Sequence, residues 1–373
     1  MIGKNMKENG EIRRCHKCAL PETYPGVQFD YNGTCNYCAY FEIFQKRQEI
    51  VREQIGEEFT SIIEEAKKLK KRYDCLLCFS GGKDSTYLLD NLKKQFDLKI
   101  LAYTLDNGFL SPRALENISS IPEVLDVDHI IFKPRMNILK KIFSDALTQP
   151  TSYPKEIISM MSPLCATCQG IVVGVTIKLA NEKDIPLIFT GYTPAQYPNI
   201  SFENFLKARS CIYFATSVHK DDPVDILRII RDPVEELCGE EINNYYFKSQ
   251  YLKEGEEFPK IIFPYHSLLN YDEEEIYDTL KDLGWKKPSD TDPCSTNCLI
   301  NTLGNYSCLK QFSYHPYIGE MSSLVRSGLL SYKKALESEH IDEDCYAMNY
   351  SLNKLGLTKT DIIKMFDKGN NHK

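Results

Sequence analysis

The feature that most constrains this chain of 373 residues is the segment Tyr73–Ser85, YDCLLCFSGGKDS. Its apolar residues 75–79 read as a buried strand, and the residues after Ser85 carry apolar side chains at helical spacing. A strand, a turn with two glycines and a helix leave free backbone N–H groups at a helix N-terminus. These orphan donors and the helix dipole both favour an anion. The segment therefore predicts a phosphate site.

The motif itself, SGGKDS, differs from the Walker A pattern, which requires GxxxxGK followed by Ser or Thr. It resembles the PP-loop, SGGxDS, of the ATP pyrophosphatase superfamily. Those enzymes bind the pyrophosphate part of ATP and let a substrate oxygen attack the α-phosphate, which forms an adenylated intermediate and pyrophosphate. The resemblance implies that ATP phosphates bind at Ser80, Gly81, Gly82 and Ser85, that Lys83 neutralises charge, and that Asp84 holds Mg²⁺.

Strands and helices alternate after this motif. Residues 98–105, 129–133 and 186–190 read as strands, with helical runs between them. The alternation predicts an α/β fold with a doubly wound, mostly parallel sheet that binds ligands at the carboxyl ends of its strands. The superfamily resemblance implies further ATP contacts, which are assigned to Thr104, Asp106 and the loop at Gly191.

Two CxxC pairs lie near the N-terminus with sixteen residues between them. Four cysteines at this spacing fit a tetrahedral zinc site, in which each pair offers two thiolates to one ion. Disulfides and a [4Fe–4S] cluster are the alternatives. The predicted zinc ligands are Cys15, Cys18, Cys35 and Cys38.

The stretch that contains these cysteines, CHKCALPETYPGVQFDYNGTCNYC, resembles the start of the N-acetyl sugar amidotransferases, PP-loop enzymes of bacterial surface-sugar biosynthesis. Residues 315–317, 325–328 and 355–358 resemble their C-terminal helices, where Thr358 is expected to cap a helix. The resemblance implies adenylation of a carbonyl or amide oxygen on a sugar acceptor and displacement of AMP by ammonia. Because the chain shows no obvious glutaminase module, a separate glutaminase subunit is expected to supply the ammonia. The matching N-terminal residues are Thr23, Pro25, Gly26, Phe29, Asp30 and Gly33.

A second set of cysteines suggests a different nucleophile. Cys165 and Cys168 form a CxxC at the expected start of a helix, where the helix dipole is expected to make both thiols unusually acidic. With the distant segment DPCSTNC they resemble PP-loop sulfur transferases that thiolate tRNA with a [4Fe–4S] cluster held by three cysteines. Cys294 is the expected third ligand and Cys298 its rival. This alternative implies sulfide as the nucleophile and a tRNA base or metabolite as acceptor; inert pairs and a second zinc site remain open.

Composition limits the partners of the chain. A net charge of −7 and a pI near 5.7 give no general attraction to nucleic acid, and the basic run at 67–72 reads as a solvated helix face. The absence of a run of some eighteen apolar residues predicts no membrane span, and the polar N-terminus predicts no secretory signal. We therefore expect a cytoplasmic protein whose fourteen cysteines are ligands, catalytic groups or packing residues rather than disulfides.

Four units are expected along the chain. They are a zinc-ribbon module at 1–45, a linking helix at 46–72, the PP-loop domain at 73–285 and a C-terminal helical region at 286–373. Within the third unit, residues 200–260 read as an insertion that lines a substrate pocket. A helix near its end is expected to begin with a capping box made by Asp272 and Glu275. A non-catalytic nucleotide-binding or zinc-scaffold protein is the remaining functional alternative.

Overall fold

The structure is a computed structural model that describes residues 12–41, 59–148, 158–159, 161–193, 259–262, 264–266 and 272–370. The expected insertion at 200–260 lies outside these residues except for its last two positions. Of the expected linking helix at 46–72, residues 59–68 are helical and residues 46–58 lie outside the described part.

A five-stranded parallel sheet with the strand order β3-β2-β1-β4-β5 forms the centre of the chain. The last residue of β1, Cys78, lies opposite Tyr103 of β2 and Thr190 of β4, so the carboxyl ends of these strands share one edge. The sheet confirms the predicted α/β fold class. Its strands are β1 (Cys75–Cys78), β2 (Ile100–Leu105), β3 (Asp128–Phe132), β4 (Leu187–Thr190) and β5 (Lys260–Ile262).

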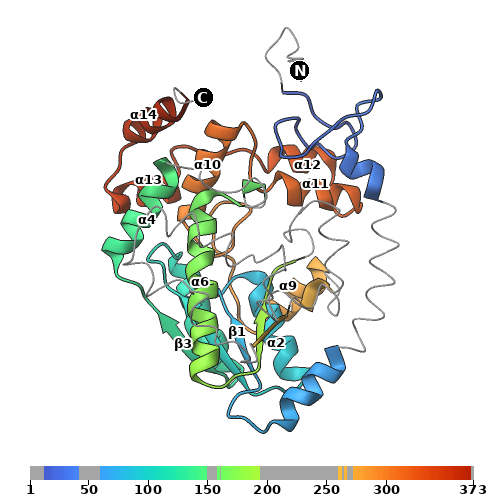
Figure 1. The fold of residues 1–373 in the computed structure, drawn as a ribbon, viewed down its shortest axis with the longest axis vertical. Helices are drawn as coiled ribbons and strands as arrows, with labels where there is room; N and C mark the ends of the chain where they lie inside the picture. The colour runs from blue at the N-terminus through green and yellow to red at the C-terminus, as the bar shows by residue number, and fades with distance from the viewer. Residues whose placement is uncertain are drawn as a thin grey trace, which may run out of the picture.

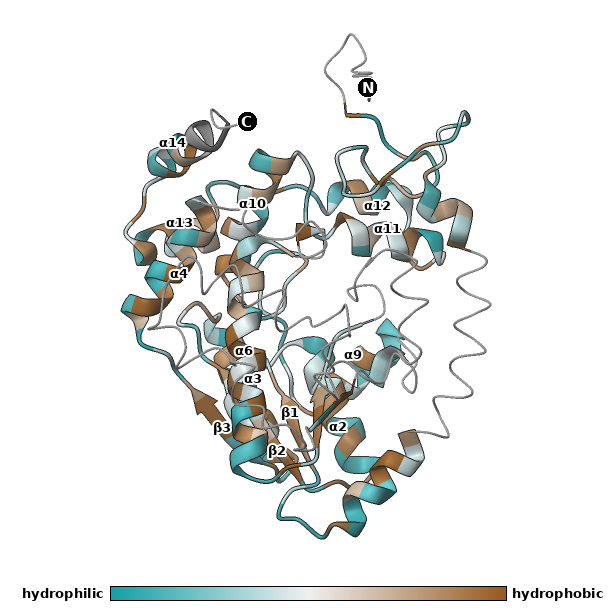
Figure 2. Ribbon diagram, in the orientation of Figure 1, coloured by the Kyte–Doolittle hydropathy of each residue, from teal (hydrophilic) through white to brown (hydrophobic). Residues whose placement is uncertain are grey.

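Helices cover both faces of this sheet, because its buried strands are apolar on both sides (Figure 2). On β1, Leu77 belongs to one buried cluster and Leu76 to the other. One face packs against residues 59–68 and against α2 (Lys83–Lys94), α3 (Pro112–Val124) and α9 (Glu273–Asp282). The other face packs against α4 (Met136–Thr148) and the long α6 (Pro163–Glu182), which crosses the sheet in Figure 1.

The C-terminal helices gather at one end of the sheet, beyond the amino end of α6 (Figure 1). There α10 contacts both α6 and α13, and α14 contacts α4. This region therefore shares the core of the sheet domain rather than forming a separate body. Its helices are α10 (Ile300–Phe312), α11 (Ile318–Arg326), α12 (Tyr332–Glu337), α13 (Tyr346–Leu355) and α14 (Lys359–Asn370).

The N-terminal segment lies against these C-terminal helices, beside α11 and α12 in Figure 1. The Thr23 hydroxyl donates to the carbonyl oxygen of Ser313 at 2.7 Å, and Arg14 forms an ion pair with Glu339 at 2.7 Å. The buried Tyr24 hydroxyl donates to a main-chain carbonyl, that of Ser159, at 2.9 Å. The two regions that carry the amidotransferase resemblance are thus packed on each other.

Two expected helix caps can be compared with the structure. The Asp272 carboxylate accepts the backbone N–H groups of Glu274 and Glu275, which confirms it as the N-cap of α9. The expected capping box is wrong in its second half, because the Glu275 carboxylate instead accepts a hydrogen bond from the Tyr87 hydroxyl at 2.8 Å. Before α14, the Thr358 hydroxyl accepts the N–H of Asp361 at 3.1 Å, as expected of a Thr cap.

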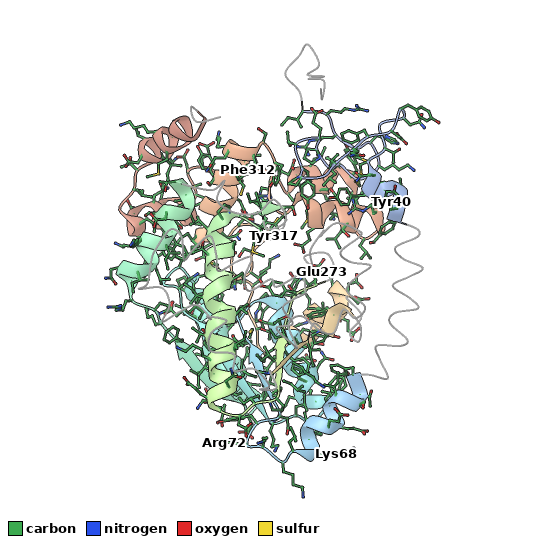
Figure 3. All side chains as sticks on the ribbon, viewed as in Figure 1. Tyr40, Lys68, Arg72, Glu273, Phe312 and Tyr317 are labelled. Carbon is green, nitrogen blue, oxygen red and sulfur yellow. The ribbon has the colours of Figure 1, made fainter. Side chains whose placement is uncertain are left out.

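Two expectations drawn from composition can also be compared with the structure. Among the described residues α6 is long and apolar enough to cross a membrane, with a window of mean hydropathy 1.5, although no such run was expected. It contacts β1, β2 and β4, as the core helix of a layered domain does. In the basic run, Lys71 pairs with Asp184, and Lys68 and Arg72 lie at the end of the molecule far from the C-terminal helices (Figure 3).

Candidate functional site

The SGGKDS loop connects β1 to α2 in a conformation that requires glycine. Gly81 has φ +69°, and a Cβ atom there would lie 2.5 Å from Cγ1 of Ile118. Its carbonyl oxygen accepts the indole N–H of Trp285 at 2.9 Å, which fixes the loop from outside. The helix α2 begins at Lys83 directly after this turn, and its N-cap, Gly82, has no side chain that could cap the helix. The turn therefore lies at a helix N-terminus, where the sequence predicts an anion site.

The serines of the motif lie together at this turn. The Oγ atoms of Ser80 and Ser85 are 3.0 Å apart, and the Ser80 N–H donates to Ser85 Oγ at 3.2 Å. The predicted Gly191 approaches the same turn, because a Cβ on it would lie 3.2 Å from the Ser85 Cα. The structure thus brings the predicted residues Ser80, Ser85 and Gly191 together.

Lys83 is the cation of the loop. Its Nζ lies 2.9 Å from a carboxylate oxygen of Glu273, on α9, and 3.9 Å from a carboxylate oxygen of Asp84. Burial alone would lower the pKa of Lys83, but the two carboxylates outweigh it and leave that pKa raised. Lys83 is therefore a charged donor, held by an acidic partner that the sequence did not indicate.

A cavity of about 300 Å³ opens beside this loop. One wall contains Ser80 and the residues from Gly82 to Ser85 of the SGGKDS loop, and the cysteines of the core line another part of it. Tyr317, also in its lining, and Glu273 are labelled in Figure 3 and come from the C-terminal helices and from α9. The SGGKDS loop and the core cysteines thus share one cavity. The cysteines concerned are Cys165, Cys168, Cys294 and Cys298.

Two predicted ATP contacts do not line this cavity. The Thr104 hydroxyl donates to the carbonyl oxygen of Phe79 and lies 2.8 Å from Nε2 of His129, so it joins strands of the sheet. The Asp106 carboxylate pairs with Lys133 at 2.8 Å and accepts the N–H of Gly108. Both side chains stabilise the carboxyl end of β2.

Three of the core cysteines have side-chain amides as neighbours. Nδ2 of Asn107 lies 3.5 Å from the sulfur of Cys168 and 3.5 Å from the sulfur of Cys298. Nδ2 of Asn301 lies 3.4 Å from the sulfur of Cys165. The sulfurs of Cys168 and Cys298 therefore lie no farther from each other than twice 3.5 Å.

The expected acidity of the CxxC thiols is wrong. Burial raises the pKa of Cys165 to about 11 and also raises that of Cys168. Both residues do lie in the first turns of α6, after the N-cap Ser162. The loss of solvent around the two sulfurs outweighs the helix dipole, whose effect is limited to about a turn.

Cys294 occupies a different environment from Cys298. Its sulfur lies 3.9 Å from the carbonyl oxygen of Ser338. Burial raises the pKa of Cys294, and the carboxylates of Asp292, Glu320 and Glu339 raise it further. Burial also raises the pKa of Cys298, but its sulfur receives the amide N–H of Asn107. The two sulfurs therefore differ in their polar neighbours, and which of them joins the CxxC pair stays a prediction.

The loop that carries both cysteines also contacts the SGGKDS loop, which the sequence did not reveal. Oγ1 of Thr296 accepts the Lys83 N–H at 3.2 Å, and a Cβ on Gly82 would lie 2.8 Å from it. Backbone hydrogen bonds fix this loop, from Ser111 N–H to the Asn297 carbonyl and from Leu299 N–H to the Phe109 carbonyl. No local pattern around Thr296 marks it as a neighbour of the SGGKDS loop.

The N-terminal cysteines form a second candidate site. Their four sulfurs all lie within 4.8 Å of one another, with 3.8 Å between Cys15 and Cys38 and 3.6 Å between Cys18 and Cys35. A tetrahedral ion with bonds of about 2.3 Å keeps its sulfurs about 3.8 Å apart. A disulfide would need about 2.05 Å. The spacing fits one metal ion and excludes disulfides among these four residues.

The charges around these four sulfurs also favour a cation. Hydrogen bonding to Cys35 and Cys38 lowers the pKa of Cys18, with a smaller effect from Arg326, and the same contacts raise the pKa of Cys35 and Cys38. Adjacent thiols cannot all ionise unless a cation lies between them. Nη1 of Arg326, at the end of α11, donates to the Cys18 sulfur at 3.3 Å. A C-terminal arginine thus contacts the N-terminal site directly.

No protein-family model matches the chain. The chain is 25% identical over 297 residues to the uncharacterized protein MJ1599 of Methanocaldococcus jannaschii. The matched residues are 79% of this chain and 83% of that protein.

Two solved structures are similar at low TM-scores. One is the U34-tRNA thiolase NcsA from Methanococcus maripaludis with its [4Fe–4S] cluster, with a TM-score of 0.33 and 15% identity, covering 93% of this chain and 99% of that one. The other is the NMN synthetase from Francisella tularensis, with a TM-score of 0.34 and 13% identity, covering 83% and 97%. Likenesses of this size are too weak to assign a function.

Proposed function

We propose that this chain is an ATP-dependent adenylating enzyme of the PP-loop superfamily that forms AMP and pyrophosphate. The observation that carries the proposal is the shared cavity, in which an anion-binding helix N-terminus with Lys83 lies beside a set of cysteines. An acceptor oxygen, from a carbonyl or amide, attacks the α-phosphorus of ATP, and the bond from that phosphorus to pyrophosphate breaks. The cavity then contains the activated acceptor next to the place from which a nucleophile attacks.

In this proposal the chain contributes mainly electrostatic stabilisation. The Ser80–Ser85 turn at the start of α2 binds the pyrophosphate, and Lys83 compensates the charge that develops as it leaves. Asp84, which also lines the cavity, is the carboxylate that would hold Mg²⁺, a cation that prefers carboxylate and phosphate oxygens. The proposed zinc at the four N-terminal cysteines has a structural role, because those sulfurs occupy all four positions of a tetrahedral ion.

For the second step, the cavity supports sulfur transfer best. The sulfurs of Cys165, Cys168 and Cys298 meet amide N–H donors, and thiolates bound to iron are suited to that environment. Among the described residues, these cysteines are not grouped as closely as the N-terminal four, whose sulfurs lie within 4.8 Å of one another. A [4Fe–4S] cluster on three thiolates would supply one iron free to carry sulfur. The acceptor is then a tRNA base or a small metabolite.

Ammonia is the nucleophile of the second candidate, an N-acetyl sugar amidotransferase. Its support is the resemblance at both ends of the chain, and the structure packs those ends together through the ion pair of Arg14 with Glu339 and the contact of Arg326 with Cys18. In this case the acceptor is a sugar, and a separate glutaminase subunit supplies ammonia to the cavity.

The adenylation proposal is tested by release of AMP and pyrophosphate from ATP in the presence of candidate acceptors. Asp84→Ala should abolish AMP formation and leave the zinc content unchanged. Asp278→Ala, which removes an exposed carboxylate from α9, serves as the charge-matched control and should behave like the wild type. AMP formation that survives in Asp84→Ala would show that the catalytic loop is wrongly assigned.

The nucleophile is tested by metal and labile-sulfide analysis of protein purified without oxygen. About four irons with matching sulfide, lost in the double variant Cys165→Ala/Cys168→Ala, would support sulfur transfer. About one zinc and no iron would support the amidotransferase and direct the search to a glutaminase partner.

A further inference from the structure

Asn107 is a buried amide in the loop that follows β2, with 4% of its surface exposed. Its Nδ2 lies at equal distances, 3.5 Å, from the sulfurs of Cys168 and Cys298. Those cysteines come from α6 and from the distant loop before α10. It joins two parts of the cysteine set that are far apart in sequence.

The orientation of the Asn107 amide follows from a second contact. Its Oδ1 accepts the backbone N–H of Phe109 at 2.9 Å. Because a backbone N–H can only donate, the oxygen of the amide must face Phe109 and the NH₂ group must face the sulfurs. Both sulfurs therefore meet a donor.

Asn301 repeats this arrangement at the third sulfur. Its Nδ2 lies 3.4 Å from the sulfur of Cys165, and its Oδ1 accepts an N–H from Asn305 at 2.8 Å. Asn301 is also 4% exposed. Each sulfur of the proposed ligand set thus faces an amide donor, whereas the sulfur of Cys294 faces the carbonyl of Ser338.

A buried amide N–H needs an acceptor, and a neutral thiol is a weak one. A cysteine bound to a metal is a thiolate, which accepts hydrogen bonds well. Around metal sites, such contacts orient the ligands, and hydrogen bonds to the sulfurs of an iron–sulfur cluster change its reduction potential. The donors stabilise the more negative, reduced state and so raise that potential.

We propose that Asn107 is a positioning residue that orients Cys168 and Cys298 as ligands of one iron–sulfur cluster and raises its reduction potential through N–H···S hydrogen bonds. This inference rests on the proposed ligand set of Cys165, Cys168 and Cys298. Asn301 makes the corresponding contact to Cys165, with a smaller effect because it reaches one sulfur.

The test uses the full chain, purified without oxygen and reconstituted with iron and sulfide. Asn107→Asp keeps the oxygen that accepts the Phe109 N–H but replaces the NH₂ donor with an acceptor. We expect iron retention against a chelator to fall about tenfold or more, and the reduction potential of any cluster that remains to shift downward. Asn107→Ala, which removes the donor without adding charge, should give a smaller downward shift.

The matched control is Asn117→Asp. Asn117 is also a buried amide, 2% exposed, and it bonds the main chain of Lys286 instead of sulfur. The variant Asn117→Asp should lose at least as much thermal stability as Asn107→Asp but keep the iron retention and reduction potential of the wild type. This comparison separates an effect on the ligands from an effect on folding. Circular dichroism of the metal-free proteins shows whether each variant folds. If Asn107→Asp does not fold, Asn107→Ala and Asn301→Asp supply the test.

Two outcomes would overturn the inference, and they are distinct. Wild-type iron retention and potential in both Asn107 variants would show that its amide does not act on the sulfurs, with the ligand set intact. A wild-type chain that holds no iron would overturn the ligand set and the inference together. Neither result bears on adenylation, which AMP release measures separately.

Discussion

Replacing Glu273 with glutamine should tighten the binding of ATP by up to about fivefold. In the structure Glu273 Oε1 lies 2.9 Å from Nζ of Lys83, the cation that the proposed mechanism directs to the phosphates. ATP must therefore compete with a carboxylate for this ammonium group, and that carboxylate also repels the incoming phosphates. Glu273→Gln removes both effects and keeps the shape of the side chain.

The size of the effect follows from the exposure of the pair. The Lys83 side chain is 11% exposed, but that of Glu273 is 63% exposed, so water screens the interaction. Ion pairs with one such exposed partner contribute about 1 kcal/mol or less. At 1.36 kcal/mol for each tenfold change, 1 kcal/mol corresponds to about fivefold in the dissociation constant.

Calorimetric titration with a non-hydrolysable ATP analogue and Mg²⁺ measures this change. The control is Glu274→Gln, which removes the same charge from the same first turn of α9 but, in the described part of the chain, from a carboxylate without an ion pair. The difference between the two variants should shrink at high ionic strength, because screening weakens an exposed charge. Weaker binding in Glu273→Gln would refute this reasoning and would indicate that Glu273 itself helps to hold the nucleotide or its metal.

Two further predictions concern the metal site and the sheet. Arg326→Gln should lower the zinc affinity of the N-terminal cysteines about tenfold or more, because the Arg326 guanidinium contacts the Cys18 sulfur. Chelator competition measures this affinity, and equal affinities in Arg326→Gln and in the control Arg113→Gln would contradict the prediction. Burial lowers the pKa of His129 from 6.5 to about 4, so the unfolded chain takes up a proton in that window that the folded chain does not. Stability should therefore fall as the pH drops from 6.5 toward 4. His129→Gln should flatten that dependence in urea unfolding, and an unchanged dependence would assign it to another group.

The parts of this structure that the sequence predicts well are those set by local contacts. The apolar run of β1, the glycine turn and the amphipathic α2 follow one another directly, and the positive φ of Gly81 explains why glycine is needed there. The four N-terminal sulfurs are likewise predictable, because each CxxC pair places two thiols within one turn of chain.

Predictions that depend on the balance of solvation and on distant contacts succeed less often. The expected acidity of Cys165 and Cys168 took account of the helix dipole but not of their burial, which has the larger effect. Glu275 follows the capping-box pattern, yet it bonds Tyr87, which lies 188 residues earlier in the chain. A sequence pattern shows neither how deeply a thiol is buried nor which distant side chain forms a hydrogen bond with a capping residue.

The choice between Cys294 and Cys298 shows most clearly what local patterns omit. Both cysteines occupy one loop, and spacing treats them alike. Backbone hydrogen bonds to Ser111 and Phe109 determine that Cys298 faces Asn107, while the Thr296 hydroxyl, two residues before it, meets the N–H of Lys83. One short, firmly bonded loop thus contacts both the SGGKDS turn and the cysteine set. In the proposed reaction, in which the acceptor is activated with ATP and then attacked from the cysteines, this loop would keep the two sites at a fixed spacing.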